Sequence, residues 1–259
     1  MKTRIWAVMQ KEWLEAMTNK MILFTMSLLP LLILGISLGT LYGINSGVFG
    51  EESSGQRIPS QFVGMDPKDA MNLMMATEYL VLFLIVPVSI PVTIASYSIV
   101  GEKENKSLEP LLATPIRTWE LLVAKSAAAV LPAIVIGWLV YGVFVLGAGM
   151  VARPVVVRLA LEPMWVVANL AIGPLLALLS VLAGVIASSR MSDPRAVQQM
   201  VAFFVVPILV VGIGQMMGVL LLNVGTVLLG ALLIALLDGA VLCVAVRLFR
   251  RETILTRWR

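Results

Sequence analysis

The sequence predicts an all-α membrane protein with six transmembrane helices. Of its 259 residues, 59% are hydrophobic and 13% are charged, and the mean hydropathy is +0.97. A water-soluble domain cannot bury so large an apolar fraction, so part of the solvent must be lipid. A helix needs roughly 20 apolar residues to cross a hydrocarbon core of about 30 Å, and the length leaves room for about six such helices. We expect them to form one permease domain, residues 1–259.

Charged or turn-forming residues separate the apolar runs. Each run is long enough to cross the membrane, and the third is long enough to extend beyond it. The expected spans are residues 21–44, 77–100, 119–150, 163–187, 197–220 and 224–249.

Residues 1–20 precede the first span and have helical periodicity. One side of this helix is apolar and the other polar, which is typical of a helix in the membrane interface with its tryptophans at headgroup depth. The apolar side has Ile5, Trp6, Met9, Trp13 and Met17, and the polar side has Arg4, Lys11, Glu15 and Thr18. The apolar run that follows is too long for a signal-peptide core, so we expect the first span to remain as an anchor.

The distribution of basic residues predicts the orientation of the spans. Of the 19 Lys and Arg residues, 15 fall on the side of the two termini and 4 on the opposite side. Both termini are therefore expected in the cytoplasm of a multi-pass cell-membrane protein. Because these residues are scattered between spans, they do not form the basic face that nucleic-acid binding requires, and no nucleic acid is expected.

Three kinds of local signal accompany the spans. Asp66 before Pro67 predicts a helix start that continues into the second span. Gly35, Gly39 and Gly43 have the four-residue spacing that lets helices pack closely, either within the chain or in a dimer. Prolines within spans predict kinks and are tolerated where other groups satisfy the carbonyls they free. These prolines are Pro30, Pro87, Pro91, Pro132, Pro174 and Pro207.

Several chemistries are excluded by the residues present. The chain has no histidine and a single cysteine, Cys243, so disulfides, His-based catalysis and zinc sites are not expected. It also has no G-x-x-x-x-G-K-[ST] phosphate loop, so it cannot hydrolyse ATP by itself. Asp238 is the ionisable residue that lies most clearly inside a span. It is either a protonated or hydrogen-bonded packing residue, or a translocation or switch residue.

Residues 101–117, GEKENKSLEPLLATPIR, predict a short amphipathic element at the membrane surface. Leu108, Leu111 and Leu112 share one side of this element, and Pro115 ends it. By pattern alone, these leucines could simply dip into lipid.

This segment resembles the first cytoplasmic loop of type-2 ABC exporter permeases, whose recurrent form is E-x-E, then S/T-L-E, then L-L and T-P. SSRMSDPRAVQQ at residues 188–199 is similar to the loop between spans four and five of that family. LFRRETIL at residues 248–255 and Lys11-Glu12 are further matches. With six spans in the expected places, the resemblance covers essentially the whole chain.

The resemblance implies a function for this loop. Residues 102–117 would contain a cytoplasmic coupling helix that docks onto an ATPase, with leucines filling a pocket and carboxylates meeting its basic rim. The residues expected to make this contact are Glu102, Glu104, Leu108, Glu109, Leu111, Leu112, Thr114 and Pro115. Two cytoplasmic ABC ATPase subunits, a second permease subunit and membrane lipid are the implied partners. ATP and Mg would bind to the ATPases, with no cofactor and no enzyme activity on this chain.

Two other functions are compatible with the same spans. One is an ATP-independent secondary transporter or channel, and the other is a membrane scaffold that recruits a cytoplasmic partner. Ion-coupled transporters normally bury several ionisable groups, whereas here the spans are nearly free of charge. This favours an exporter of a hydrophobic or amphipathic cargo.

Overall fold

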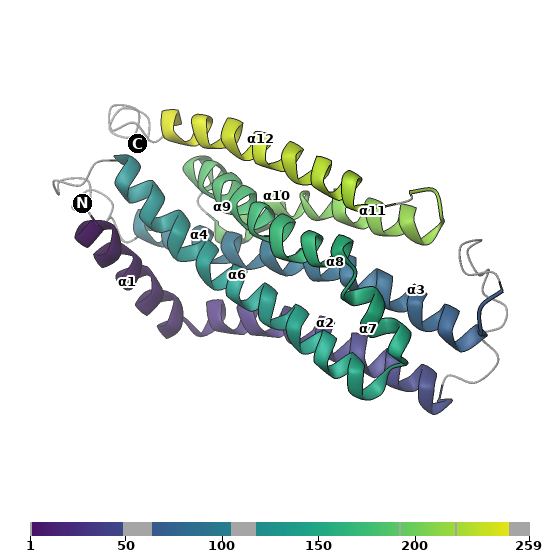
Figure 1. Cartoon of the computed structure of the whole chain (residues 1–259). Helices are drawn as coiled ribbons and strands as arrows, with labels where there is room; N and C mark the ends of the chain where they lie inside the picture. Colours follow the sequence, from purple (N-terminus) through teal and green to yellow (C-terminus); the bar gives the residue numbers. More distant parts are fainter. Residues whose placement is uncertain (1, 49–63, 105–117, 192, 221, 249–259) are drawn as a thin grey trace.

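The computed structural model describes residues 2–48, 64–104, 118–191, 193–220 and 222–248 (Figure 1). The structure is 90% helical, and the described residues include no strand. The helical elements in chain order are α1 (Lys2–Thr18), α2 (Lys20–Ser46), α3 (Pro67–Leu82), η3 (Phe83–Ile85), α4 (Val86–Glu104), α6 (Thr118–Val151), α7 (Pro154–Ala160), α8 (Pro163–Val167), η4 (Ala168–Ile172), α9 (Gly173–Arg190), α10 (Pro194–Ala202), α11 (Val205–Met216) and α12 (Val224–Leu248).

Six helical stretches are long and apolar enough to cross a membrane, which confirms the predicted fold class. They are Lys20–Ser46, Pro67–Ser98, Trp119–Val151, Pro163–Arg190, Pro194–Gln215 and Val224–Arg247. The second starts at Pro67, ahead of the apolar run, because α3 continues through η3 into α4 as the Asp66-Pro67 signal predicts. The fifth is divided by a turn at Phe203 and Phe204 into α10 and α11.

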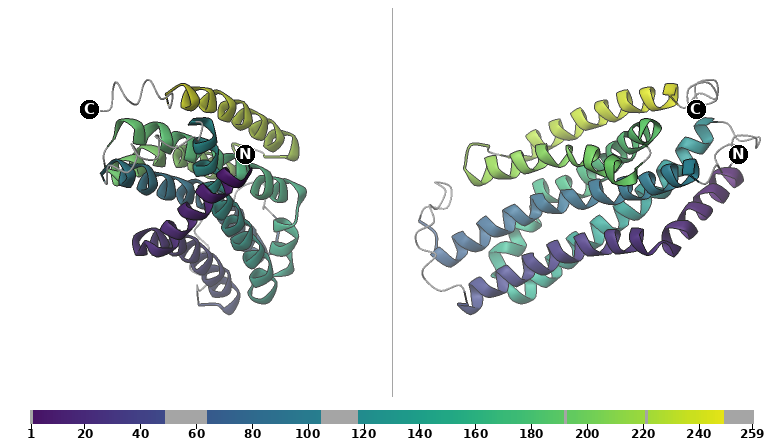
Figure 2. Two further views of the ribbon diagram at one scale, coloured as in Figure 1. Left: turned by 90° about the vertical axis from the view of Figure 1, so that its left-hand side faces the viewer. Right: turned by 180° about the vertical axis from the view of Figure 1, so that it is seen from behind.

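Helix α4 lies at the centre of the bundle and packs against α9, α6, α10 and α2 (Figure 2). Most of the second and fourth spans is buried, whereas only a minor share of each of the other four is buried. Val86, Ile90, Val181 and Leu182 form part of the core between α4 and α9, and each is at most 1% exposed. Two spans thus form a buried centre, and four surround it.

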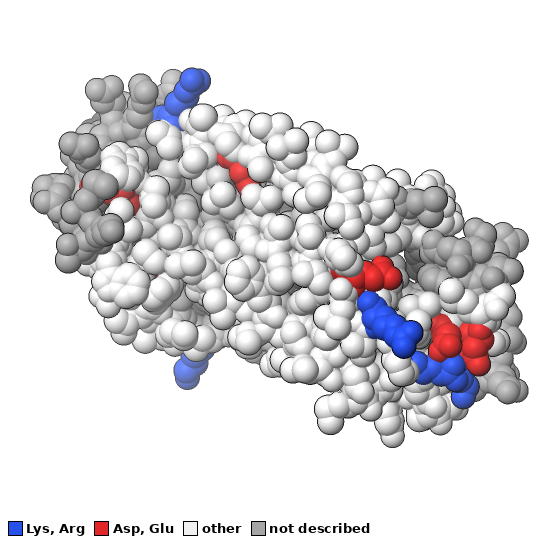
Figure 3. Space-filling model, in the orientation of Figure 1, with Lys and Arg blue, Asp and Glu red and all other residues white. Residues whose placement is uncertain are grey.

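The outer surface of the bundle is apolar. Leu229, Leu232, Leu233 and Leu236 on α12 are each more than half exposed. Figure 3 shows charged side chains mainly near the two ends of the molecule, with a largely uncharged surface between them. Such a surface is unfavourable in water and favourable in hydrocarbon, so the chain is a multi-pass membrane protein.

Two prolines in the spans follow a tightened helical turn. A proline at position i has no N–H for the carbonyl at i−4, which in lipid must find another donor. Before Pro87, the Phe83 carbonyl accepts from the Val86 N–H within η3. Before Pro207, the Phe203 carbonyl accepts from the Val206 N–H at 3.2 Å. In both places the carbonyl accepts a hydrogen bond from the N–H three residues later, and the helix there departs from α geometry.

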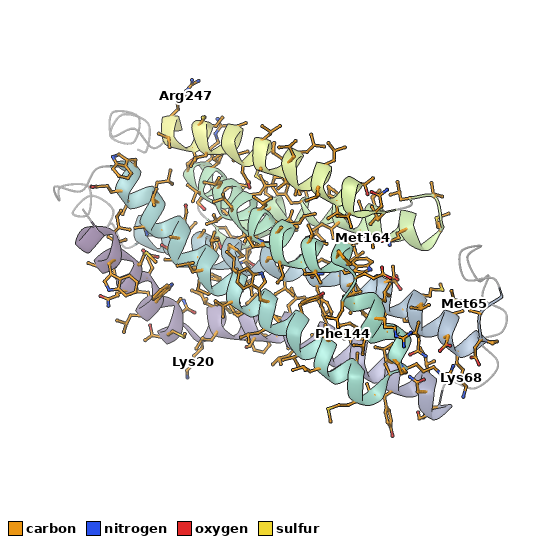
Figure 4. All side chains as sticks on the ribbon, viewed as in Figure 1. Lys20, Met65, Lys68, Phe144, Met164 and Arg247 are labelled. Atoms are coloured by element: carbon orange, nitrogen blue, oxygen red, sulfur yellow. The ribbon has the colours of Figure 1, made fainter. Side chains whose placement is uncertain are left out.

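The bundle has two distinct ends (Figure 1). We refer to the end where α1 begins and α12 finishes as the terminal end, and to the end where α3 begins and α7 lies as the distal end. Lys20 lies toward the terminal end, whereas Met65 and Lys68 lie at the distal end (Figure 4).

Polar contacts join three helices at the distal end. The Asp66 carboxylate caps α3 by accepting from the Lys68 N–H at 2.8 Å. Arg153, just after α6, pairs with Asp69 at 2.8 Å and with Asp66 at 3.2 Å. The Asn45 amide on α2 donates to Asn72 on α3 at 3.1 Å. These contacts hold the start of α3 to the ends of α2 and α6.

The Asp66 contacts predict how acid affects the distal end. The bond from the Lys68 N–H, with Arg153 nearby, lowers the pKa of Asp66 below its usual 3.8. A lowered pKa in the folded state means that Asp66 stabilises the fold above pH 3.8 and that this stabilisation is lost as pH falls through the lower, folded pKa. We expect Arg153→Gln to lower the thermal midpoint in detergent at pH 7 by a few degrees, with a smaller difference from wild type below pH 4.

Arg158, exposed on α7 at the same end, provides the matched control. Arg158→Gln removes the same charge and should leave the midpoint unchanged. Equal shifts for the two variants would show that net charge, not the Arg153 contacts, determines the result.

Candidate functional site

The described helices that flank the predicted coupling segment meet it at the terminal end, where α4 ends and α6 begins (Figure 1). Glu102 and Glu104 lie in the last turn of α4, and α6 starts at Thr118. The remaining predicted coupling residues are outside the described residues: Leu108, Glu109, Leu111, Leu112, Thr114 and Pro115. Since α4 and α6 pack against each other, they hold both ends of the segment 105–117 in a defined place.

The second family-like segment, residues 188–199, includes the start of α10, which packs against α4. Asp193 caps α10 by accepting from the Arg195 N–H at 2.8 Å. Val197 and Val201 on one face of α10 are buried, and Gln198 donates to Ser96 on α4 at 3.4 Å. The loop 188–199 therefore lies against α4, the helix that leads into the segment 105–117.

Helix α1 packs against the start of α6 through an apolar face. Val8 and Met9 on α1 meet Leu121, Ala124 and Ala128 on α6. The periodicity of residues 1–20 correctly predicts a helix with an apolar side. Met9 on that side is buried toward α6, whereas Trp6 and Met17 on the same side are 49% and 69% exposed.

The Trp13 indole connects α1 to the backbone of α6. Its Nε1–H donates to the carbonyl of Ala128 at 2.9 Å. This carbonyl lies four residues before Pro132, which has no N–H to offer it. A side chain from another helix therefore satisfies the group that the proline frees, as expected for a proline within a membrane span.

One turn toward the terminal end, a buried ion pair joins the same two helices. Lys125 Nζ lies 2.6 Å from Glu12 Oε1, and the side chains are 10% and 3% exposed. Lys125 also donates to Ser98 Oγ on α4 at 2.6 Å. Sequence reasoning missed this cluster. A possible signal was Glu12 between the apolar positions Val8, Met9 and Ala16 of one helical face.

Asp238 lies near the middle of α12 and is 4% exposed, although most of that helix is exposed. Its two carboxylate oxygens have no hydrogen-bond partner among the described residues. The bond to a neighbouring helix that the sequence allowed is therefore not present in the described structure. Helix α9, which packs against α12, has no ionisable residue between Gly173 and Ser189. Helix α9 therefore offers the carboxyl group no opposite charge.

Polar connections between helices are the main feature of the described part of the site. Within the described ranges, no group of three or more His, Cys, Asp or Glu side chains could hold a metal ion. What the terminal end does contain is a segment between two packed helices, α4 and α6, with a third helix, α1, paired to Lys125 of α6, which also bonds Ser98 of α4.

Comparison with known proteins identifies the family. The model of the ABC-2 family transporter proteins matches residues 6–231, from α1 into α12. No curated protein matches the chain. Members of this family are the transmembrane components of ABC transporters, distinct from the ATPase, and they associate with ABC ATPases in general. The match covers most of the chain, including both loops described above, and the chain therefore belongs to the ABC-2 family of transporter permeases.

Proposed function

We propose that this chain is the permease subunit of an ATP-driven exporter, in which two permeases assemble with two separate ABC ATPase subunits. ATP and Mg would bind to the ATPases, because this sequence has no phosphate loop. The observation that carries the proposal is the position of the family-like segment GEKENKSLEPLLATPIR, which joins the packed helices α4 and α6. A force on that segment would be transmitted to two spans at once.

The proposed mechanism is alternating access. ATP would draw the two ATPases together, and the segment 105–117 would follow the ATPase surface on which it docks. Helices behave as rigid elements, so the displacement would tilt α4 and α6 and open a path between the permeases. ATP can drive this change only if it favours one arrangement of the permeases over the other.

The exposed surface of α2 supports a second permease subunit. Gly35 and Gly39 lie on this helix, and a Cβ atom added at either would meet nothing within 4 Å. Close packing within the described chain therefore does not explain these glycines. Small residues at that spacing allow another helix backbone to approach, and in a dimer that helix would come from the second permease.

The docking of Leu108 and Leu111 gives the sharpest test of the proposed function. Replacing both with Asp should leave membrane insertion intact, because they lie between spans. Two carboxylates in an apolar pocket would cost several kcal/mol, enough to weaken ATPase binding by orders of magnitude. We expect co-purification with the ATPase to be lost, which an affinity pull-down from solubilised membranes would measure. Charge reversal at Glu102 and Glu104 should act more mildly and depend on salt.

Val48 provides the control for added charge. It follows the end of α2 at the distal end and is 73% exposed, and Val48→Asp should retain ATPase binding. Wild-type binding by the double leucine variant would mean that the segment lies on the lipid surface instead, and the exporter proposal would lose its main support.

The proposed orientation, with both termini in the cytoplasm, can be tested by cysteine labelling. Single cysteines at Val48, exposed at the distal end, and Asp193, exposed just before α10, would be introduced in a Cys243→Ser background. A membrane-impermeant maleimide should label Val48→Cys in intact cells and Asp193→Cys only after the membrane is opened. The reverse pattern would invert the topology, and labelling of both from outside would contradict the six-span arrangement.

Asp238 separates a packing role from a transport role. If its carboxyl group stays neutral, Asp238→Asn preserves its shape and should keep assembly and ATP turnover within about twofold of wild type. Size-exclusion chromatography measures assembly, and phosphate release from the reconstituted complex measures ATP turnover. Normal assembly with lost turnover would instead place Asp238 on the path or in the switch.

A further inference from the structure

We propose that Lys125 is a positioning residue of the transport cycle. By binding Glu12 and Ser98 together, its ammonium group joins α1 to both helices that flank the segment 105–117. The inference rests on the proposed function, since it gives α1 a part in a motion that an ATPase would drive through that segment.

The three groups come from three helices and meet close to the segment. Ser98 lies about two helical turns before the end of α4, and Lys125 about two turns after the start of α6. Glu12 lies on α1, more than a hundred residues before Lys125 in the sequence. A displacement of the segment would reach this ammonium group after roughly 10 Å of helix on either side.

Burial makes this connection stiff. The Glu12 and Lys125 side chains are 3% and 10% exposed, so water and salt screen their attraction little. The pair between Lys11 and Glu15 on the same helix has a longer distance of 3.3 Å, and its side chains are 42% and 53% exposed. Such a surface pair restrains a helix weakly. The same helix thus offers one buried pair directed at α6 and one exposed pair within α1.

A second attachment prevents α1 from pivoting about the ion pair. The bond from Trp13 to the Ala128 carbonyl lies about one turn further along α6. With two attachments at different heights, a tilt of α6 must carry α1 with it. A single residue, Asn19, separates α1 from the first span, α2, and caps that span by accepting from the Met21 and Ile22 N–H groups. Movement of the segment 105–117 would therefore reach the first span through α1.

The test measures attachment and coupling separately. Spin labels at Gln10 on α1 and Val123 on α6, both exposed, report the distance between the two helices in a Cys243→Ser background. The distance is measured in the full-length permease, alone and with its ATPase, with and without a non-hydrolysable ATP analogue and Mg²⁺. ATP turnover of the complex is measured in parallel. The variants are Glu12→Gln, Lys125→Gln and Ser98→Ala, with Glu15→Gln as the matched control.

Wild type should show one narrow distance that the nucleotide does not change, because α1 and α6 move together. Glu12→Gln and Lys125→Gln should broaden and lengthen this distance and lower ATP turnover by about fivefold or more. Ser98→Ala leaves the ion pair intact, so it should keep the narrow distance while lowering turnover. Glu15→Gln should match wild type in both measurements.

Narrow distances and normal turnover in Glu12→Gln would overturn the inference. So would a broadened distance with normal turnover, because the pair would then only hold the fold together. If the glutamine variants do not accumulate in membranes, normal turnover in Ser98→Ala is the overturning result. The exchange of Glu12→Lys with Lys125→Glu should then restore the narrow distance.

The measurements also distinguish this inference from the proposed function. If no ATPase binds the wild-type permease, the proposed function fails, and the coupling role of Lys125 fails with it. If the ATPase binds and turns over ATP while the Glu12 and Lys125 variants behave as wild type, the exporter proposal stands and this inference alone is wrong.

Discussion

Inside a hydrocarbon layer no water is available to a backbone carbonyl, so each one must find a donor within the protein. This chain places prolines in its spans, and each proline removes one N–H from the helical ladder. In the described structure, the carbonyls freed by prolines accept hydrogen bonds from two kinds of donor. Phe83 and Phe203 accept from a backbone N–H three residues ahead, whereas Ala128 accepts from the Trp13 indole of another helix. The carbonyl that Pro132 leaves without a backbone donor thereby becomes a contact between α1 and α6.

The lack of water inside the hydrocarbon layer also governs where the bundle places its charged groups. At the terminal end, Glu12 and Lys125 are buried as a pair, and removing either partner would leave an isolated charge at a cost of about 3–5 kcal/mol. At the distal end, Arg153 pairs with carboxylates that remain partly exposed, where each contact contributes less. Between the two ends the visible surface is largely uncharged (Figure 3). Polar contacts therefore fix the ends of the helices, and apolar packing between α4 and α9 holds the centre.

Features that depend on neighbouring residues were predictable from the sequence, and features that depend on distant residues were not. Asp66 before Pro67 correctly indicates the start of α3, because a cap needs a few consecutive residues. The six spans follow from the length of the apolar runs. The contacts of Lys125 with Glu12 and Ser98 depend on how three helices pack, which periodicity cannot give. The turn at Phe203 was missed because the apolar run continues through it without interruption. The predicted coupling residues from Leu108 to Pro115 lie outside the described residues and remain a prediction.

The long sequence separation between α1 and its contacts on α6 has a consequence for synthesis. Trp13 and Glu12 precede Ala128 and Lys125 by 115 and 113 residues. At a translation rate of about 5–20 residues per second, Ala128 and Lys125 are synthesised roughly 6–23 seconds after Trp13 and Glu12. During that interval Trp13 and Glu12 lack these partners, although the first span has already been synthesised. Docking of α1 therefore marks the insertion of the third span, and a nascent chain stalled before it would expose this helix to chaperones and proteases.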